Sequence, residues 1–292
     1  MRKFNGRAKE KELVNSFLTL KEIKKLLILG REKVGKTALV INSIKNRNDC
    51  LYYIYRKINL DELSNINSSI TTLILDDTAD INKAMEIYKS IASSRLKLII
   101  ITSILDADKS LFDEVIELHE QKYAEACLYY YNYNDKDKDL LYKILGGEPL
   151  LNSKIDNSLT ALENIYKLAI SSDSYLELYV NLIFNTELHK SIPALNVLIS
   201  LASLNDRLTT IATSSSISTQ LALTILNKLI KLGYVERLCD GKDMNNKKRT
   251  SYRLISNCLS FYFKYIYSNL SMRALLSEEE FYTQYIKPEI GD

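Results

Sequence analysis

The stretch KLLILGREKVGKTALV, residues 25–40, decides the fold of this chain. It begins as a short apolar strand, continues as a loop with two glycines, and ends as the start of an apolar helix. The loop matches G-x-x-x-x-G-K-[ST], and the strand–loop–helix context distinguishes a phosphate-binding P-loop from a chance match in a surface loop. The stretch therefore predicts an α/β protein with a phosphate site at the carboxyl end of a parallel strand.

The chemistry of phosphate binding explains the residue types in this loop. Gly30 and Gly35 allow a sharp turn that points backbone N–H groups at a phosphate, and the next helix presents its positive end to the same anion. Lys36 adds a charge for the β- and γ-phosphates, and the Thr37 hydroxyl is a ligand for Mg²⁺. We therefore expect ATP and Mg²⁺ as cofactors. The expected nucleotide contacts in the loop are Gly30, Lys33, Val34, Gly35, Lys36, Thr37 and Ala38.

Length and composition exclude several classes of protein. The chain has 292 residues, enough for about two domains, and a net charge of +3, which implies no global polyanion partner. Its four cysteines form no C-x-x-C pair, which argues against a zinc site or a disulfide framework and favours a reducing compartment. The longest apolar run, residues 98–105, is far shorter than the ~20 residues of a membrane span. We expect a soluble, cytoplasmic protein without a membrane partner.

A second apolar segment, TTLILDD at residues 71–77, ends in two acids. We expect this strand to lie beside the P-loop strand, so that both acids reach the phosphate site. Asp76 is then the metal-side carboxylate, and Asp77 is the candidate base that orients or deprotonates a water. This is the Walker B arrangement. The alternative is that the two acids only cap the following helix.

Three further strands and a helix complete the predicted core. Residues 50–55 and 96–103 read as strands, and the second of these ends in two small hydroxyl residues, Thr102 and Ser103. A helix over residues 110–118 and a fifth strand over residues 126–131 are expected to follow. The turn Gly146-Gly147-Glu148-Pro149 ends a helix.

Four signals in this order resemble the archaeal-type ATPase family, a STAND branch of the AAA+-like P-loop ATPases. They are the box Phe4-Asn5-Gly6-Arg7 with Glu12-Leu13, the P-loop, the paired acids, and the G-G-x-P turn. The resemblance implies that Phe4, Gly6 and Arg7 lie near the adenine. It also implies that Gly147 and Pro149 lie over the nucleotide and that a hydroxyl at the end of the 96–103 strand senses the γ-phosphate. Thr102 and Ser103 both qualify for this role, and Ser103 fits the family pattern better. The implied catalytic residues are Lys36, Asp77 and Ser103, and the implied metal ligands are Thr37 and Asp76.

The sequence departs from the family at two points that bear on catalysis. Relatives usually carry Asp-Glu where this chain has Asp76-Asp77, so the candidate base is one methylene shorter. Residues 119–123 contain no arginine where relatives often place one, and Lys122 lacks the planar fork that stabilises spread charge. Slow hydrolysis is therefore expected. Relatives also continue into a nuclease-like domain near Asp292, which implies either that this chain lacks that domain or that the sequence is a fragment.

Three domains are expected: an ATPase core over residues 1–151, a helical lid over 152–190, and a winged helix-turn-helix over 191–292. The third helix of the last domain is predicted to bury its apolar stripe at Leu221, Ile225, Leu226, Leu229 and Leu232. Its opposite stripe and the following hairpin carry the candidate double-stranded DNA contacts. These are Gln220, Thr224, Asn227, Lys231, Lys247, Lys248 and Arg249. The alternative is a module for packing, protein contact or self-association.

The sequence thus favours a nucleotide-driven ATPase switch coupled to a winged helix. Two other functions stay open. One is a DNA-binding regulator in which ATP only sets the conformation, and the other is a protein-interaction scaffold with degenerate catalysis.

Overall fold

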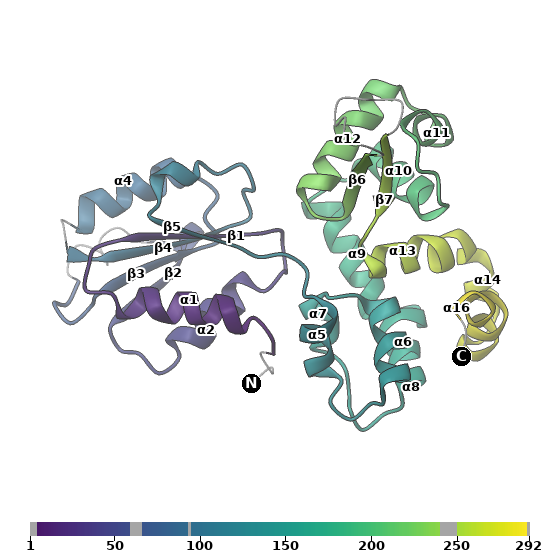
Figure 1. The fold of residues 1–292 in the computed structure, drawn as a ribbon, viewed down its shortest axis with the longest axis horizontal. Coiled ribbons are helices and arrows are strands. Elements are labelled where there is room, and N and C mark those ends of the chain that lie inside the picture. The colour runs from purple at the N-terminus through teal and green to yellow at the C-terminus, as the bar shows by residue number, and fades with distance from the viewer. Residues whose placement is uncertain (1–4, 59–65, 93–94, 240–249, 291–292) are drawn as a thin grey trace. The chain divides into compact units, whose positions relative to one another are not determined.

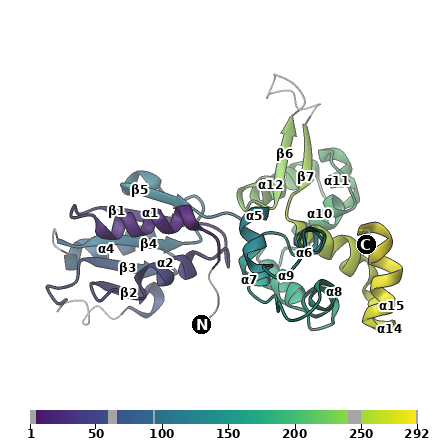
Figure 2. The same ribbon diagram turned by 60° about the horizontal axis from the view of Figure 1, so that its bottom comes forward.

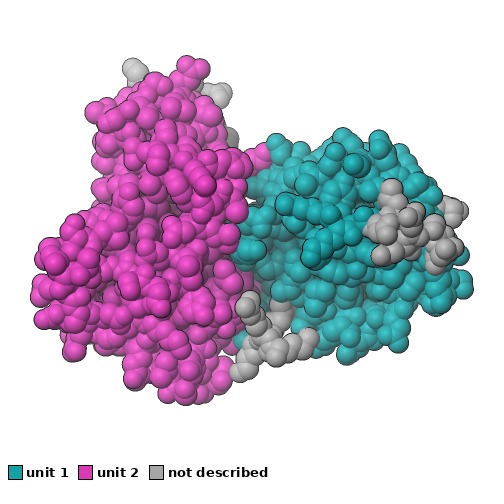
Figure 3. Space-filling model, turned by 180° about the vertical axis from the view of Figure 1, so that it is seen from behind, with its two compact units in different colours: residues 1–119 teal, residues 120–292 magenta. Residues whose placement is uncertain are grey.

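The computed structural model describes residues 5–58, 66–92, 95–239 and 250–290. The chain divides into two compact units, residues 1–119 and 120–292 (Figures 1 and 3). The first unit is an α/β structure, and the second is helical with one two-stranded hairpin. The boundary between the units therefore falls earlier than the boundary expected after residue 151.

The first unit alternates strands with helices, as its apolar segments predict. Its strands are β1 (Lys25–Leu29), β2 (Cys50–Ile54), β3 (Thr72–Asp76), β4 (Lys97–Thr102) and β5 (Glu114–Glu117). Its helices are α1 (Ala8–Thr19), α2 (Lys36–Ile44) and α4 (Ile81–Ala92), with short 3-10 turns η1 (Tyr55–Lys57) and η3 (Lys109–Leu111).

The five strands form one parallel sheet in the order β2-β3-β4-β1-β5 (Figure 2). Helices α1 and α2 cover one face and α4 covers the other (Figure 1). Side chains of consecutive strand residues alternate between the two faces. In β1, for example, Leu26 and Ile28 pack with α1 and α2, whereas Leu27 and Leu29 pack with α4. Because both faces are buried at the centre of the sheet, β1, β3 and β4 read as nearly continuous apolar runs.

Two expectations about this sheet are wrong. Strand β3, which ends at Asp76, does not lie beside the P-loop strand, because β4 is hydrogen-bonded between them. The fifth strand is Glu114–Glu117, within the segment expected to be a helix, and residues 123–129 are helical instead. Both segments are short, and the pattern of a short segment does not distinguish a strand from a helix. Tyr129 and Tyr130 are buried in the helical core of the second unit.

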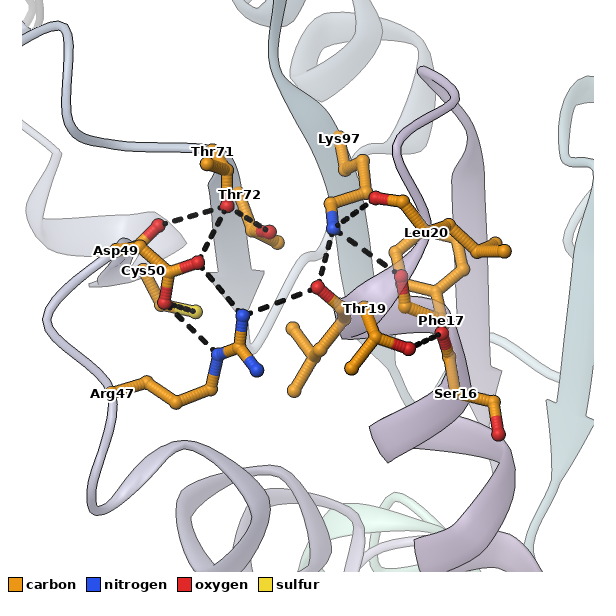
Figure 4. Close-up of polar contacts among 11 residues, drawn as sticks. Ser16, Phe17, Thr19, Leu20, Arg47, Asp49, Cys50, Thr71, Thr72 and Lys97 are labelled. Carbon is orange, nitrogen blue, oxygen red and sulfur yellow. Dashed lines mark hydrogen bonds and ion pairs between the residues drawn. The ribbon is translucent and has the colours of Figure 1, made fainter.

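A polar cluster joins the end of α1 to the amino edge of the sheet (Figure 4). Lys97, at the start of β4, is buried, and its Nζ donates to the carbonyl oxygens of Leu18 at 2.6 Å, Leu20 at 2.9 Å and Phe17 at 3.4 Å. These carbonyls lie at the carboxyl end of α1, where a helix lacks its own donors. Lys97 therefore caps the carboxyl end of α1 and fixes the helix to the sheet.

Beside Lys97, Arg47 and Asp49 form a two-bond ion pair, with distances of 2.9 Å from Nε to Oδ1 and 2.8 Å from Nη2 to Oδ2. Arg47 Nη2 also donates to the Leu18 carbonyl at 3.2 Å, and the Thr71 hydroxyl donates to Asp49 Oδ2 at 2.8 Å. The Arg47 guanidinium and the Thr71 hydroxyl hold the pKa of Asp49 down, from 3.8 to about 2. The carboxylate is thus stabilised in its charged form.

This shift predicts an acid-sensitive contribution to stability. The folded pKa of Asp49 lies below the unfolded value, so the stabilisation is present above about pH 4 and is lost as the pH falls toward about 2. Asp49→Asn should lower the free energy of unfolding at pH 7 by about 1 kcal/mol, because the pair is partly exposed to solvent. Thermal melts at pH 7 and pH 3 should show the difference from wild type shrink at the lower pH. A difference of equal size at pH 7 and pH 3 would contradict the assignment, and Glu86→Gln, at an exposed position of α4, is the control.

The second unit consists mainly of short helices. Its helices begin with α5 (Tyr123–Ala126), η4 (Cys127–Tyr129), α6 (Asp135–Leu145), α7 (Pro149–Asn152), α8 (Ala161–Ile165), the π-helix η5 (Tyr166–Ile170) and α9 (Tyr175–Thr186). Next come α10 (Ile192–Ala202), α11 (Leu208–Ser214), α12 (Thr219–Lys231) and the antiparallel strands β6 (Val235–Cys239) and β7 (Thr250–Leu254). The last elements are α13 (Asn257–Phe261), η7 (Tyr262–Ile266), η8 (Tyr267–Asn269), α14 (Leu270–Leu275), α15 (Glu278–Phe281), η9 (Tyr282–Ile286) and α16 (Lys287–Ile290).

One continuous apolar core joins these helices, from Ala126 to Ile286. Residues 126–151 belong to this core, which explains why the first unit ends before them. Arg273 of α14 ties the last part of the chain to the segment expected to form the lid. Its guanidinium donates to the Ile170 carbonyl at 2.8 Å and pairs with Glu177 at 2.8 Å. In the part of the chain that the structure describes, no helix combines the length and apolarity needed to cross a bilayer.

Candidate phosphate-binding site

The glycines of residues 30–37 are required by the local backbone. A Cβ on Gly30 would lie 2.5 Å from the Leu118 carbonyl oxygen, so the residue that follows β5 leaves no room for a side chain there. Gly35, with φ of 104°, is the left-handed residue directly before α2. Lys33, with φ of 59°, also takes the left-handed conformation. These turns lead the chain from β1 into a nine-residue helix whose amino end faces the loop.

Lys36 lies at the start of α2 and is buried. Its Nζ donates to the carbonyl oxygens of Gly30 at 2.6 Å and Arg31 at 2.8 Å, and to Ser103 Oγ at 3.0 Å. Ser103 Oγ in turn donates to Glu32 Oε1 at 2.7 Å. The end of β4 is therefore joined to the loop through one lysine and one hydroxyl.

The two hydroxyls at the end of β4 have different surroundings. Thr102 is buried, and its Oγ1 donates to the Thr78 carbonyl at 2.7 Å. Ser103 Oγ contacts Lys36 and Glu32. Of the two candidates in the sequence, Ser103 is thus the one brought to the loop, and Thr102 has a structural contact.

Thr37 and Asp76 come together although 39 positions separate them in the chain. Thr37 Oγ1 donates to Asp76 Oδ2 at 2.7 Å, and the Tyr52 hydroxyl donates to the same oxygen. Burial and the hydrogen bond to Asp76 raise the pKa of Tyr52, so this phenol stays protonated and remains a donor. Asp76 Oδ1 accepts from the backbone N–H of Asp77 at 2.7 Å. The carboxylate is thus held in one orientation.

This donor set fits Mg²⁺. A hydroxyl and a carboxylate are hard oxygen ligands, and Mg²⁺ commonly takes one or two carboxylates together with substrate phosphates and waters. Among the described residues, no group of three or more His, Cys, Asp and Glu side chains is placed to hold a metal by itself. The residues present therefore suit a metal that arrives with a phosphate ligand.

Asp77 follows β3 with a left-handed φ of 56°. Its side chain is 49% exposed, and Oδ2 lies 3.2 Å from Nε of Arg56, whose side chain is 69% exposed. Arg56 belongs to η1, the turn after β2. Asp77 is thus accessible to solvent and ion-paired with a neighbouring turn.

The amino-terminal box meets the loop through Arg7. This residue is buried and directly precedes α1, and its Nη2 donates to the carbonyl oxygens of Val34, at 3.2 Å, and His119. Gly6, with φ of 76°, makes the preceding turn. Arg7 therefore stabilises the backbone of the loop. Phe4 lies outside the described residues.

Other predicted loop contacts differ in burial. Val34 is fully buried in the core beneath α1 and α2, so only its backbone is placed to serve a ligand. Lys33, Thr37 and Ala38 are exposed.

Gly147 and Pro149 belong to the second unit. The backbone N–H of Gly147 donates to Glu120 Oε1 at 2.7 Å, and its carbonyl accepts from the N–H of Gln121 at 2.9 Å. A Cβ on Gly147 would lie 1.7 Å from the Gln121 carbonyl oxygen, so glycine is required by this close packing. Pro149 is the first residue of α7, where its missing N–H costs nothing. These contacts are the local role of the G-G-x-P turn.

The predicted polar stripe on α12 is exposed at each of its four positions, Gln220, Thr224, Asn227 and Lys231. Thr224 Oγ1 donates back to the Gln220 carbonyl at 3.1 Å. Leu221, expected to be buried, is 41% exposed. It lies next to the polar stripe in the first turn of the helix, beyond the reach of the core. Lys247, Lys248 and Arg249 lie outside the described residues.

The sequence reasoning missed Glu32, Tyr52 and Arg56. Each of them contacts a residue at the end of a strand that is distant in the sequence, and no motif marks such a pairing. For Tyr52 alone, the alternation of side chains along β2 gave a signal. It places Tyr52 on the same face as α2, since Tyr52 packs with that core.

No protein-family model matches the chain, and neither does any curated protein. Solved structures that resemble it include the Thermotoga maritima RuvB Holliday junction branch migration motor, at 13% identity and a TM-score of 0.43, with 84% of this chain and 94% of that chain covered. The Pyrococcus horikoshii STAND protein with a tetratricopeptide repeat sensor has 16% identity and a TM-score of 0.40. That match covers 97% of this chain and 44% of the other, so this chain spans less than half of that protein.

The Drosophila ORC bound to DNA has 13% identity and a TM-score of 0.40, with 90% of this chain and 87% of that chain covered. These neighbours are P-loop ATPases of the AAA+ and STAND classes. The likenesses are distant, and what this chain does has to follow from its own residues.

Proposed function

We propose that the first unit binds ATP with Mg²⁺ and hydrolyses it slowly, as an AAA+-like switch related to the archaeal-type ATPases. The observation that carries this proposal is the convergence of Lys36, Thr37, Asp76 and Ser103. They come from the P-loop helix and the ends of two other strands, and hydrogen bonds of 2.7–3.0 Å join them in pairs. A basic group, a hydroxyl donor and a hydroxyl–carboxylate pair are the parts that hold a nucleoside triphosphate.

Each residue has a distinct part in this proposal. Lys36 and the backbone N–H groups of residues 33–37 bind the phosphates, and Thr37 and Asp76 hold the metal. Bound Mg²⁺ neutralises charge on the phosphate oxygens. The Asp77 carboxylate orients the attacking water and accepts its proton, and Ser103 donates to the terminal phosphate. Arg56 is ion-paired with one oxygen of the Asp77 carboxylate and competes with the attacking water for it, which favours slow turnover.

In the second unit we propose a helical lid, residues 152–190, and a winged helix-turn-helix formed by α10, α11, α12 and the β6–β7 hairpin. The nucleotide state would then be transmitted to these helices. The exposed stripe Gln220, Thr224, Asn227 and Lys231 favours a second candidate function, a DNA-binding regulator in which ATP sets only the conformation. The same exposed surface would also serve a protein partner.

Hydrolysis measured with Asp77→Ala tests the enzymatic part. We expect kcat to fall by about 100-fold or more, because a general base is lost. The dissociation constant for ATP should change by less than about threefold, since Asp77 contacts neither the loop nor the metal pair through its side chain. Phosphate release should be followed with and without duplex DNA. Glu86→Ala, at an exposed position of α4, is the control variant.

The results separate the candidate functions. Turnover that survives in Asp77→Ala would refute the assigned base. ATP binding without turnover in the wild-type chain would leave the conformational switch and exclude the enzyme. Stimulation by DNA that weakens with added salt would favour the DNA-binding function.

A further inference from the structure

We infer that Glu32 competes with the terminal phosphate of ATP and so sets the preference of the site between ATP and ADP. This inference rests on the proposed function. It concerns the acid inside the P-loop, which the proposed mechanism does not use.

The position of the Glu32 carboxylate is given by its bond with Ser103. Ser103 Oγ accepts from Lys36 Nζ at 3.0 Å and donates to Glu32 Oε1 at 2.7 Å. One hydroxyl therefore contacts both the carboxylate and the ammonium group that serves the phosphates. Glu32 is half-buried, so its charge is only partly screened by water.

Lys36 Nζ and Ser103 Oγ are also the donors assigned to the terminal phosphate. A serine hydroxyl has a single proton, so Ser103 cannot donate to Glu32 and to a phosphate oxygen at the same time. A γ-phosphate at Ser103 would also bring two or more negative charges close to the Glu32 carboxylate. ATP must therefore displace Glu32 from Ser103, and the repulsion remains after displacement.

ADP lacks the phosphate that makes these contacts. Its β-phosphate is bound by the backbone of the loop, and it leaves the Ser103–Glu32 bond in place. Glu32 thus weakens the binding of ATP more than that of ADP. A site of this kind binds ATP firmly only when something moves Glu32 away from Ser103.

The test is a calorimetric titration of wild type and Glu32→Gln with Mg-ATP and with Mg-ADP. Glutamine keeps an oxygen that accepts from Ser103 but removes the charge. The dissociation constant for ATP should fall about tenfold, the effect of one close like charge, and that for ADP should change by less than about twofold. Glu86→Gln removes the same charge from exposed α4 and should change neither constant. Far-UV circular dichroism checks that the variants are folded.

The outcomes distinguish this inference from the proposed function. Equal tightening for both nucleotides, or no change for either, would overturn the role of Glu32. The proposed function would still stand in that case, provided that ATP binding by the wild-type chain depends on Lys36. Absence of ATP binding in the wild-type chain and in Glu32→Gln alike would overturn both.

Discussion

Lys36→Ala should raise the dissociation constant for ATP by about 100-fold or more. A charged hydrogen bond is worth about 1.5–3 kcal/mol, and 2.7 kcal/mol corresponds to a factor of about 100. Lys36 is buried, and its Nζ is held at the loop by the Gly30 and Arg31 carbonyls. The ammonium is thus already oriented toward the loop. Calorimetric titration with Mg-ATP measures the effect.

The matched control is Lys45→Ala. Lys45 is exposed at the carboxyl end of α2, so this change removes the same charge from the same helix at its far end. Its dissociation constant for ATP should stay within about threefold of wild type, since the charge there is screened by solvent. Retention of wild-type affinity in Lys36→Ala would refute the phosphate site itself.

Lys97→Met should lower the free energy of unfolding by about 2–3 kcal/mol. Two effects oppose each other at this site. Burial lowers the pKa of Lys97, which shows that holding the ammonium there has a cost, and methionine relieves it. However, the variant removes a charged donor from the carbonyls of Phe17, Leu18 and Leu20. Phe17 keeps the Leu20 N–H and Leu18 keeps Arg47 Nη2, whereas the Leu20 carbonyl loses its donor. The second effect dominates, because a hydrogen bond to a charged group contributes about 1.5–3 kcal/mol and a buried group left unsatisfied costs about 1–3 kcal/mol.

Thermal unfolding gives the measurement. A loss of this size corresponds to a decrease in Tm of roughly 10 °C for a unit of this length. Lys89→Met, on exposed α4, replaces a lysine of the same kind outside the cluster and should shift Tm by less than about 2 °C. A wild-type Tm in Lys97→Met would mean that water replaces the ammonium without loss.

Several parts of the site were predictable because they are local. Gly30, Gly35, Lys36 and Thr37 occupy contiguous positions, and the strand before them and the helix after them follow directly from apolar patterning. Asp76 was predictable too, since it ends an apolar strand. In these cases the residue types are required by the backbone geometry of one short segment.

The errors arose where local patterns are ambiguous. Residues 114–117 carry only one buried side chain, Ile116, so a short edge strand between charged residues did not read as a strand. The aromatic segment at residues 126–131 resembles a strand but is helical up to Tyr129, and Tyr129 and Tyr130 pack among helices of the second unit. A helix can bury an aromatic side chain as well as a strand can, so aromatic residues alone do not predict a strand.

The amino-acid sequence alone establishes a strand, a glycine-containing loop, a helix and an acid-terminated strand, because each of these is encoded within a few consecutive residues. Strand order is different, since it depends on which distant segments bury each other. It places β4 between β1 and β3, brings Ser103 to Lys36 and Glu32, and sets Tyr52 against Asp76. These pairings span 24 to 71 positions of the chain, so they exist only once the sheet has formed.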